Sequence, residues 1–175
     1  MTRLTAADRL IVALDYVTLT QALAMARRLD GLIRAVKVGS ALFTADGPAA
    51  IQRLRALGLS VMLDVKFFDI PSTVELSCQA AVSHRVAMLT VDAAGERSML
   101  EAAVAGARRE AARLRVARPL VLGVTVLTSV GAPSVTRQVL GLAQKALAAG
   151  CDGVVASAQE AAALRVRFGR RLYLV

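Results

Sequence analysis

Aromatic residues are scarce in this sequence, whose 175 residues include 4 Phe, 2 Tyr and no Trp. Ala, Val and Leu must therefore build the core. The chain also lacks the interleaved aromatic and basic residues on which proteins stack single-stranded nucleic acids. Cysteine is equally rare, since Cys78 and Cys151 are the only two and each lies in an apolar segment. They provide neither a disulfide framework nor the ligand spacing of a metal site.

No run of residues is long and apolar enough to predict a transmembrane helix. The longest uncharged stretch, 119–136, contains two Pro and two Gly, whereas a spanning helix needs about 20 mostly apolar residues. The N-terminus does not resemble a secretory signal, because Asp8 and Arg9 stand directly before the first apolar run. Hydrophobic residues make up 56% of the chain, which excludes disorder. We predict one soluble, cytoplasmic α/β domain over residues 1–175, with no membrane partner.

Acidic residues are outnumbered, because 22 Lys and Arg against 13 Asp and Glu give a formal net charge of +9. Most of the excess is arginine at helical spacing, which is typical of solvated outer helix faces. These arginines are Arg108, Arg109, Arg113, Arg115, Arg165, Arg167, Arg170 and Arg171. We therefore expect no nucleic-acid partner, although the positive field is compatible with a phosphorylated metabolite.

Short apolar runs alternate with Ala-rich amphipathic stretches, as parallel α/β sheets require. Thr18 is the predicted N-cap of the first helix, and Pro71 is expected in the first turn of a later one. The expected strands are 10–15, 35–39, 60–66, 87–92, 119–125, 153–156 and 172–175; the expected helices are 19–29, 47–57, 72–83, 96–114, 134–149 and 158–168. This order predicts a TIM-type (β/α)8 barrel that lacks its eighth strand. A doubly wound sheet is the alternative, but no GxGxxG follows the first strand.

Charged residues fall at the carboxyl ends of the expected strands, where barrel enzymes carry their active sites. They are Asp15, Lys37, Asp64 with Lys66, and Asp92. Asp64 and Lys66 are two apart on one strand, so both point to the same face. Lys37 comes from the neighbouring strand and is expected to pair with Asp64. The alternative is a structural network of ion pairs that closes the barrel top.

Asp69 follows Lys66 by three residues and precedes Ile70-Pro71. Taken alone, it is a helix-capping carboxylate, because the helix dipole favours negative charge there. Within Asp64-x-Lys66-x-x-Asp69-Ile70-Pro71, a functional role becomes the better hypothesis.

At this point the sequence resembles a known family. LIVALD (10–15), VKVG (36–39), LDVKFFDIPSTV (63–74) and VTVLTS (124–129) look like orotidine 5′-phosphate decarboxylase, and DGVVASAQEAAALR (152–165) is similar to its stretch after strand six. Related 3-keto-gulonate-phosphate decarboxylases and hexulose-phosphate synthases share D-x-K-x-x-D. They usually continue with Ala-Gly and use magnesium, whereas Ile70-Pro71 and LTS favour the orotidylate branch.

The resemblance implies decarboxylation of orotidine 5′-monophosphate to UMP in de novo pyrimidine biosynthesis, with no metal and no cofactor. Lys66 corresponds to the proton donor of the family. The catalytic charges of the family correspond to Lys37, Asp64 and Lys66 together with Asp69 of a second subunit, which implies a homodimer. The positions that match substrate contacts are Asp15, Lys37, Ile70, Thr73, Thr128 and Ser129.

Three departures from the family pattern accompany the resemblance. Asp92 and Phe68 stand where the family usually has His. The family also continues past strand seven into a loop, an eighth strand and an Arg that hold the substrate phosphate, so we expect a C-terminally truncated barrel with little activity. Two alternatives stay open: a related sugar-phosphate decarboxylase or aldolase, and an inactive fragment that acts only in binding.

Overall fold

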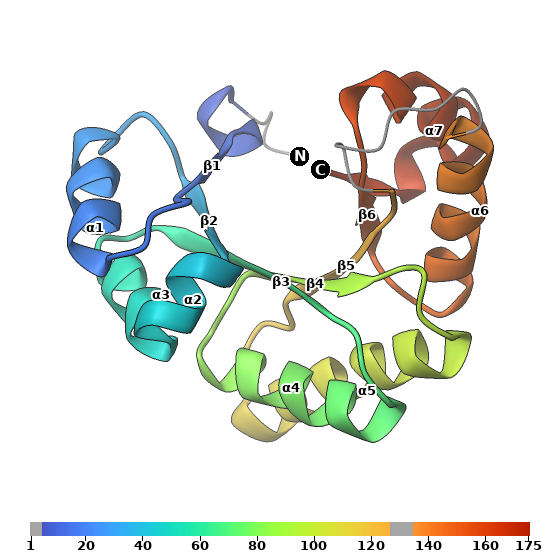
Figure 1. Cartoon of the computed structure of the whole chain (residues 1–175), viewed down its shortest axis with the longest axis horizontal. Helices are drawn as coiled ribbons and strands as arrows, with labels where there is room; N and C mark the ends of the chain where they lie inside the picture. The colour runs from blue at the N-terminus through green and yellow to red at the C-terminus, as the bar shows by residue number, and fades with distance from the viewer. Residues whose placement is uncertain (1–4, 127–134) are drawn as a thin grey trace.

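Seven parallel strands form one curled sheet in the computed structural model, which describes residues 5–126 and 135–175. Their order in the sheet is their order in the chain. The strands are β1 (Ile11–Ala13), β2 (Ala35–Gly39), β3 (Ser60–Phe67), β4 (Met88–Asp92), β5 (Leu120–Val124), β6 (Gly153–Val155) and β7 (Tyr173–Leu174). Among the described residues β1 pairs only with β2 and β7 only with β6, so the sheet is an open, barrel-like curl (Figure 1). The predicted seven-stranded TIM-type architecture is confirmed.

The helices cover the outer side of this sheet, with α1 to α3 on one flank, α4 and α5 at the middle, and α6 and α7 on the other flank (Figure 1). They are α1 (Leu19–Arg28), α2 (Ser40–Asp46), α3 (Pro48–Ala56), α4 (Pro71–Ser83), α5 (Arg97–Leu114), α6 (Val135–Ala148) and α7 (Ala161–Phe168). Short 3₁₀ turns are η1 (Ala7–Arg9), η2 (Ala158–Glu160) and η3 (Gly169–Arg171). Strands that helices cover are continuous runs of apolar residues, and the strands of this sequence have that pattern.

Two predicted helix starts are confirmed by their local geometry. The Thr18 side chain accepts a hydrogen bond from the backbone N–H of Gln21, which satisfies a donor that the first turn of α1 leaves free. Pro71 occupies the first turn of α4, where its missing N–H costs nothing.

Helix α2 is an element that the sequence pattern did not predict. It has seven residues, too few to show a helical period, and it ends at Gly47, whose φ of +55° turns the chain into α3. The helix buries Leu42 completely. Its last residue, Asp46, accepts a hydrogen bond of 2.9 Å from the backbone N–H of Leu19. This short helix therefore ties the end of the second βα unit to the start of α1.

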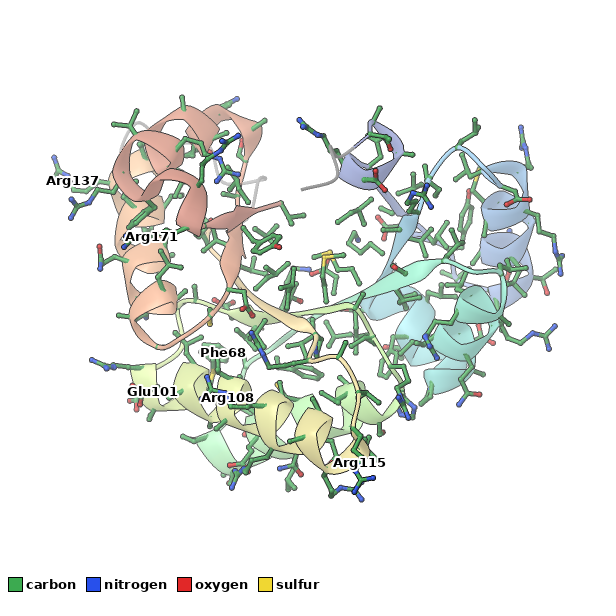
Figure 2. The ribbon with its side chains drawn as sticks, turned by 180° about the vertical axis from the view of Figure 1, so that it is seen from behind. Phe68, Glu101, Arg108, Arg115, Arg137 and Arg171 are labelled. Atoms are coloured by element: carbon green, nitrogen blue, oxygen red, sulfur yellow. The ribbon has the colours of Figure 1, made fainter. Side chains whose placement is uncertain are left out.

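The outer helices pack closely and carry the excess charge on their solvent side. A Cβ placed on Gly106 of α5 would lie 2.6 Å from the carbonyl oxygen of Glu75 on α4, so only glycine permits this approach. All eight arginines singled out in the sequence are exposed, and Arg115 and Arg137 project outward from the helices (Figure 2). In the described part of the chain, every helix is too short or too polar to cross a membrane.

Candidate active site

Four of the predicted site residues meet at the carboxyl side of β1, β2 and β3. The Lys66 Nζ lies 3.0 Å from Asp64 Oδ2, and the Lys37 Nζ lies 3.4 Å from the same oxygen. Asp15, which follows β1, places its Oδ1 3.1 Å from Lys37 Nζ. The four side chains therefore form one chain of alternating charge, Asp15–Lys37–Asp64–Lys66, which we call the charged array.

Burial differs sharply along the charged array. The Asp64 side chain is 10% exposed, whereas those of Lys37 and Lys66 are 23% and 35% exposed. A carboxylate this buried is costly unless it is paired and hydrogen-bonded, and the two ammonium groups supply the pairing. The Asp15 side chain, at 67%, is the most open member. The array thus runs from a buried anion to groups that a ligand can reach.

Gly39 makes the approach of Asp15 to Lys37 possible. It ends β2 directly opposite Asp64 in the register of the two strands. A Cβ built on Gly39 would lie 3.2 Å from Asp15 Oδ1 and 3.5 Å from Lys37 Nζ. The bare backbone therefore leaves the room in which the Asp15–Lys37 pair forms, which is a physical reason for the glycine in VKVG.

Lys66 occupies a distorted part of β3. Leu63 pairs with Leu89 but Phe67 pairs with Val91, so two extra residues of β3 are accommodated against β4. Within this bulge Lys66 has φ of +52°, the left-handed region that side chains other than glycine rarely adopt. Strained backbone of this kind is concentrated at functional sites.

Thr90 of β4 belongs to this site although the sequence pattern did not single it out. It is fully buried, and its hydroxyl donates a hydrogen bond of 3.0 Å to Asp64 Oδ1. The Thr90 hydroxyl oxygen also accepts a hydrogen bond of 3.0 Å from the backbone N–H of Lys66. A hydroxyl between the apolar residues Leu89 and Val91 was the available signal, and it is weak because threonine is common in strands.

The segment after β3 does not join the charged array within one chain. Asp69, Ile70 and Thr73 are all exposed. Asp69 Oδ1 accepts a hydrogen bond of 2.6 Å from the backbone N–H of Ile70. The N-cap residue of α4 is Ile70, and this helix has no side-chain capping bond. The alternative in which Asp69 is the N-cap of the helix is therefore wrong. Thr128 and Ser129 lie outside the described residues.

Asp92 ends β4 as predicted, but its side chain stabilises the turn that follows the strand. Its Oδ1 accepts a hydrogen bond of 2.8 Å from the backbone N–H of Ala94. Lys145 of α6 holds the same turn, because its Nζ donates to the carbonyl oxygens of Ala94 and Gly95 at 3.1 and 2.8 Å. This turn is therefore fixed from two sides.

A parallel βα sheet that carries lysine–aspartate pairs at the carboxyl side of its strands has the site placement of a TIM-barrel enzyme. The chain belongs to the orotidine 5′-phosphate decarboxylase / HUMPS family, whose model matches residues 8–175.

Relatives and solved structures agree with this assignment. A Chromohalobacter salexigens protein named orotidine 5′-phosphate decarboxylase is 47% identical and covers 91% of this chain and 70% of its own length. A Halorhodospira halophila protein of the same name is 45% identical over 95% of this chain and 72% of its own. The crystal structure of orotidine 5′-phosphate decarboxylase from Lactobacillus acidophilus aligns with a TM-score of 0.85 at 31% identity, covering 94% of this chain and 78% of that one.

Proposed function

We propose that the charged array catalyses the decarboxylation of orotidine 5′-monophosphate to UMP, the reaction of a carboxy-lyase in pyrimidine biosynthesis. Family membership supports this reaction. The observation that carries it is the buried Asp64 carboxylate held between the ammonium groups of Lys37 and Lys66. The array offers positive charge and a transferable proton at the face where a barrel binds its substrate.

Lys66 is the proton donor in this proposal. The bond between C6 of the pyrimidine and its carboxylate carbon breaks, CO2 leaves, and the electron pair stays on C6. An ammonium group beside C6 stabilises this developing charge, and its proton then forms the new C6–H bond of UMP. The neutral amine of Lys66 regains a proton from solvent.

The other members of the array hold Lys66 in its working position. Asp64 accepts from Lys66 Nζ and fixes the direction of the ammonium group. Lys37 balances the Asp64 charge and connects it to Asp15, whose exposed carboxylate is suited to bind ribose hydroxyls. Positioning of this kind accounts for a large share of catalysis when reacting atoms are held within about 3–3.5 Å.

Asp69 acts across a subunit interface in this proposal, and the protein is a homodimer. Phe68 and Ile70, on either side of Asp69, are 62% and 64% exposed. Exposed apolar residues that flank a carboxylate fit a surface that a second copy covers. Ile70 and Thr73 would then contact substrate at this same edge. The predicted contacts of Thr128 and Ser129 stay part of the proposal, as does the cytoplasmic location, which agrees with the free, buried thiols of Cys78 and Cys151.

Mixing two inactive variants tests the reaction and the shared site together. The wild-type protein is expected to form UMP from orotidine 5′-monophosphate. The variants Lys66→Ala and Asp69→Ala, each assayed alone, are expected to form none. In a hybrid dimer one site carries both lesions and the other carries neither. Because half of randomly assorted dimers are hybrids, we expect the mixture to regain about a quarter of wild-type activity.

The matched control is a mixture of Lys66→Ala with the double variant Lys66→Ala/Asp69→Ala, which contains no intact site and is expected to remain inactive. Near-normal turnover by Lys66→Ala alone would refute its role as proton donor. If exchange of subunits is verified and no activity returns, Asp69 acts within its own chain.

A further inference from the structure

Thr90 occupies the one place on β4 that faces the bulge of β3. Leu89 pairs with Leu63 and Val91 pairs with Phe67. Thr90 therefore stands alone opposite the three residues 64–66 of the neighbouring strand. Its two neighbours on β4 are paired with residues of β3 that lie outside the bulge.

The bulge creates two polar groups that the strand ladder does not satisfy. Lys66 has a left-handed backbone conformation, so its N–H does not donate to a carbonyl oxygen of β4 as it would in a regular strand. The second carboxylate oxygen of Asp64 is turned away from both lysines, whose Nζ atoms approach Oδ2. Each group is costly to bury without a partner.

One hydroxyl satisfies both groups with correct donors and acceptors. Thr90 Oγ1 accepts the N–H of Lys66 at 3.0 Å and donates its single proton to Asp64 Oδ1 at 3.0 Å. It thereby links the backbone of the lysine to the carboxylate that receives the same lysine's ammonium group. Backbone, hydroxyl, carboxylate and ammonium close a ring, which fixes where Lys66 Nζ lies.

We infer that Thr90 is a positioning residue for proton transfer by Lys66: its hydroxyl holds the Asp64 carboxylate and the Lys66 backbone in one arrangement. This inference rests on the proposed function, because it assigns Thr90 to the same reaction. Thr90 is buried beneath Asp64 and acts through it rather than on the substrate. Its loss therefore changes how the lysine is held and leaves the groups that bind substrate in place.

The hydroxyl can be separated from the shape of the side chain. Thr90→Val keeps the branched shape and removes the hydrogen bonds, whereas Thr90→Ser keeps the hydroxyl and removes a methyl group. For Thr90→Val we expect kcat to fall about 10- to 100-fold, as is usual when a supporting hydrogen bond of a reacting group is lost, with KM within about twofold of wild type. Thr90→Ser is expected to stay within about threefold of wild type in kcat.

A second measurement needs no turnover. The Lys66 N–H loses its acceptor in Thr90→Val, so its amide hydrogen exchange, followed by NMR, should accelerate about tenfold or more relative to the amides of β5. Thr90→Ser should retain slow exchange. Thr90→Ala, which lacks the hydroxyl and adds no bulk, replaces Thr90→Val if the valine variant does not fold.

The outcomes separate this inference from the proposed function. Wild-type kcat in Thr90→Val, or equal losses of kcat in Thr90→Val and Thr90→Ser, would overturn the positioning role while leaving the reaction assigned. A loss confined to KM would overturn it as well. If the wild-type protein forms no UMP, the proposed function falls and the catalytic part of this inference falls with it; exchange at Lys66 then still decides whether the hydroxyl holds the bulge.

Discussion

The two ends of the sheet each carry a partly buried group of charges, and they are built differently. At the amino end Arg118 and Asp152 precede β5 and β6 and form a two-pronged pair with N–O distances of 2.9 and 2.6 Å. Asp152 also accepts from the backbone N–H of Val121, and Arg118 donates to the carbonyl of Pro119. The paired carboxylate is also the main reason why the pKa of Arg118 is raised. This pair is therefore held by additional hydrogen bonds from the surrounding backbone.

At the carboxyl end the positive charges are lysines, each a compact ammonium on a flexible stem. The Lys66 side chain remains 35% exposed and meets Asp64 through one carboxylate oxygen. Within residues 5–126 and 135–175, Asp64 is the one acceptor of the Lys66 ammonium group, which leaves donors that can face a ligand. The two-pronged Arg118–Asp152 pair suits a structural role, while the more exposed Lys66–Asp64 pair suits chemistry. The difference agrees with the general division of barrels into a stabilising amino face and a catalytic carboxyl face.

Removing one negative charge from each end tests this division most directly. Asp64→Asn should lower kcat/KM at least about 100-fold, because it releases Lys66. It should change the free energy of unfolding by only about 1 kcal/mol, because it also removes the cost of burying the carboxylate and leaves lysines that are partly exposed. Asp152→Asn should destabilise the protein by about 2 kcal/mol, because it leaves Arg118 partly buried without its anion, and should leave kcat/KM near wild type. Urea unfolding and UMP assays on both variants measure the two effects.

The comparison of the two ends depends on opposite effects: Asp64→Asn should lose activity, and Asp152→Asn should lose stability. If Asp152→Asn lost activity while remaining folded, the amino end would contribute to function after all. If Asp64→Asn kept wild-type turnover and only lost stability, the charged array would be a structural network of ion pairs, the alternative that the sequence left open.

The architecture could be predicted from the sequence because apolar strands alternate with Ala-rich helices, and residues such as Thr18 and Pro71 mark where helices begin. The strand 35–39 matches β2 residue for residue, and the other strands agree within about three residues at either end. The expected pairing of Lys37 with Asp64 is present, since neighbouring parallel strands bring their carboxyl ends together. Periodicity was sufficient for these features.

The features that were missed depend on departures from regular geometry. The bulge in β3 changes the register without leaving a glycine or proline to mark it, because Lys66 itself adopts the left-handed conformation. Thr90 matters only because it faces that bulge. Helix α2 was missed because its seven residues are set by packing of Leu42 rather than by a repeated pattern. Tertiary context decides each of these cases.

Gly39 gives a smaller and more local test at the carboxyl end. Its φ is ordinary for any residue, so Gly39→Ala introduces no backbone strain. The new methyl group would press on the Asp15 carboxylate, which is 3.2 Å from its position. We expect kcat/KM to fall about tenfold, mainly through KM, because Asp15 is displaced while Asp64 and Lys66 keep their contacts. Steady-state kinetics checks this, with Gly141→Ala, where a Cβ meets nothing within 4 Å, as the control. A change confined to kcat would contradict the role of Asp15 in binding.

The smallest expected effect concerns the amino end and its dependence on pH. Burial, followed by the charge of Asp152, raises the pKa of the Cys151 thiol from its ordinary value of 9.0 to about 12. Above pH 9 the unfolded chain loses this proton while the folded chain keeps it, so the contribution of the thiol to stability is complete below pH 9 and declines as the pH rises towards 12. Between pH 8 and pH 10 the loss is about 1 kcal/mol for this group.

Cys151→Ala removes that dependence without touching the charged array. Urea unfolding at pH 8 and pH 10 should show a smaller loss of stability in the variant than in wild type, with the remaining slope shared by Cys78, whose thiol pKa burial also raises to about 12. Because the amino end holds the fold and does not contact the reacting atoms, kcat/KM should follow the same pH profile in both proteins. A profile that differs between them would connect the amino end to catalysis, and equal pH slopes of stability would show that the Cys151 thiol ionises as readily in the folded chain as in the unfolded one.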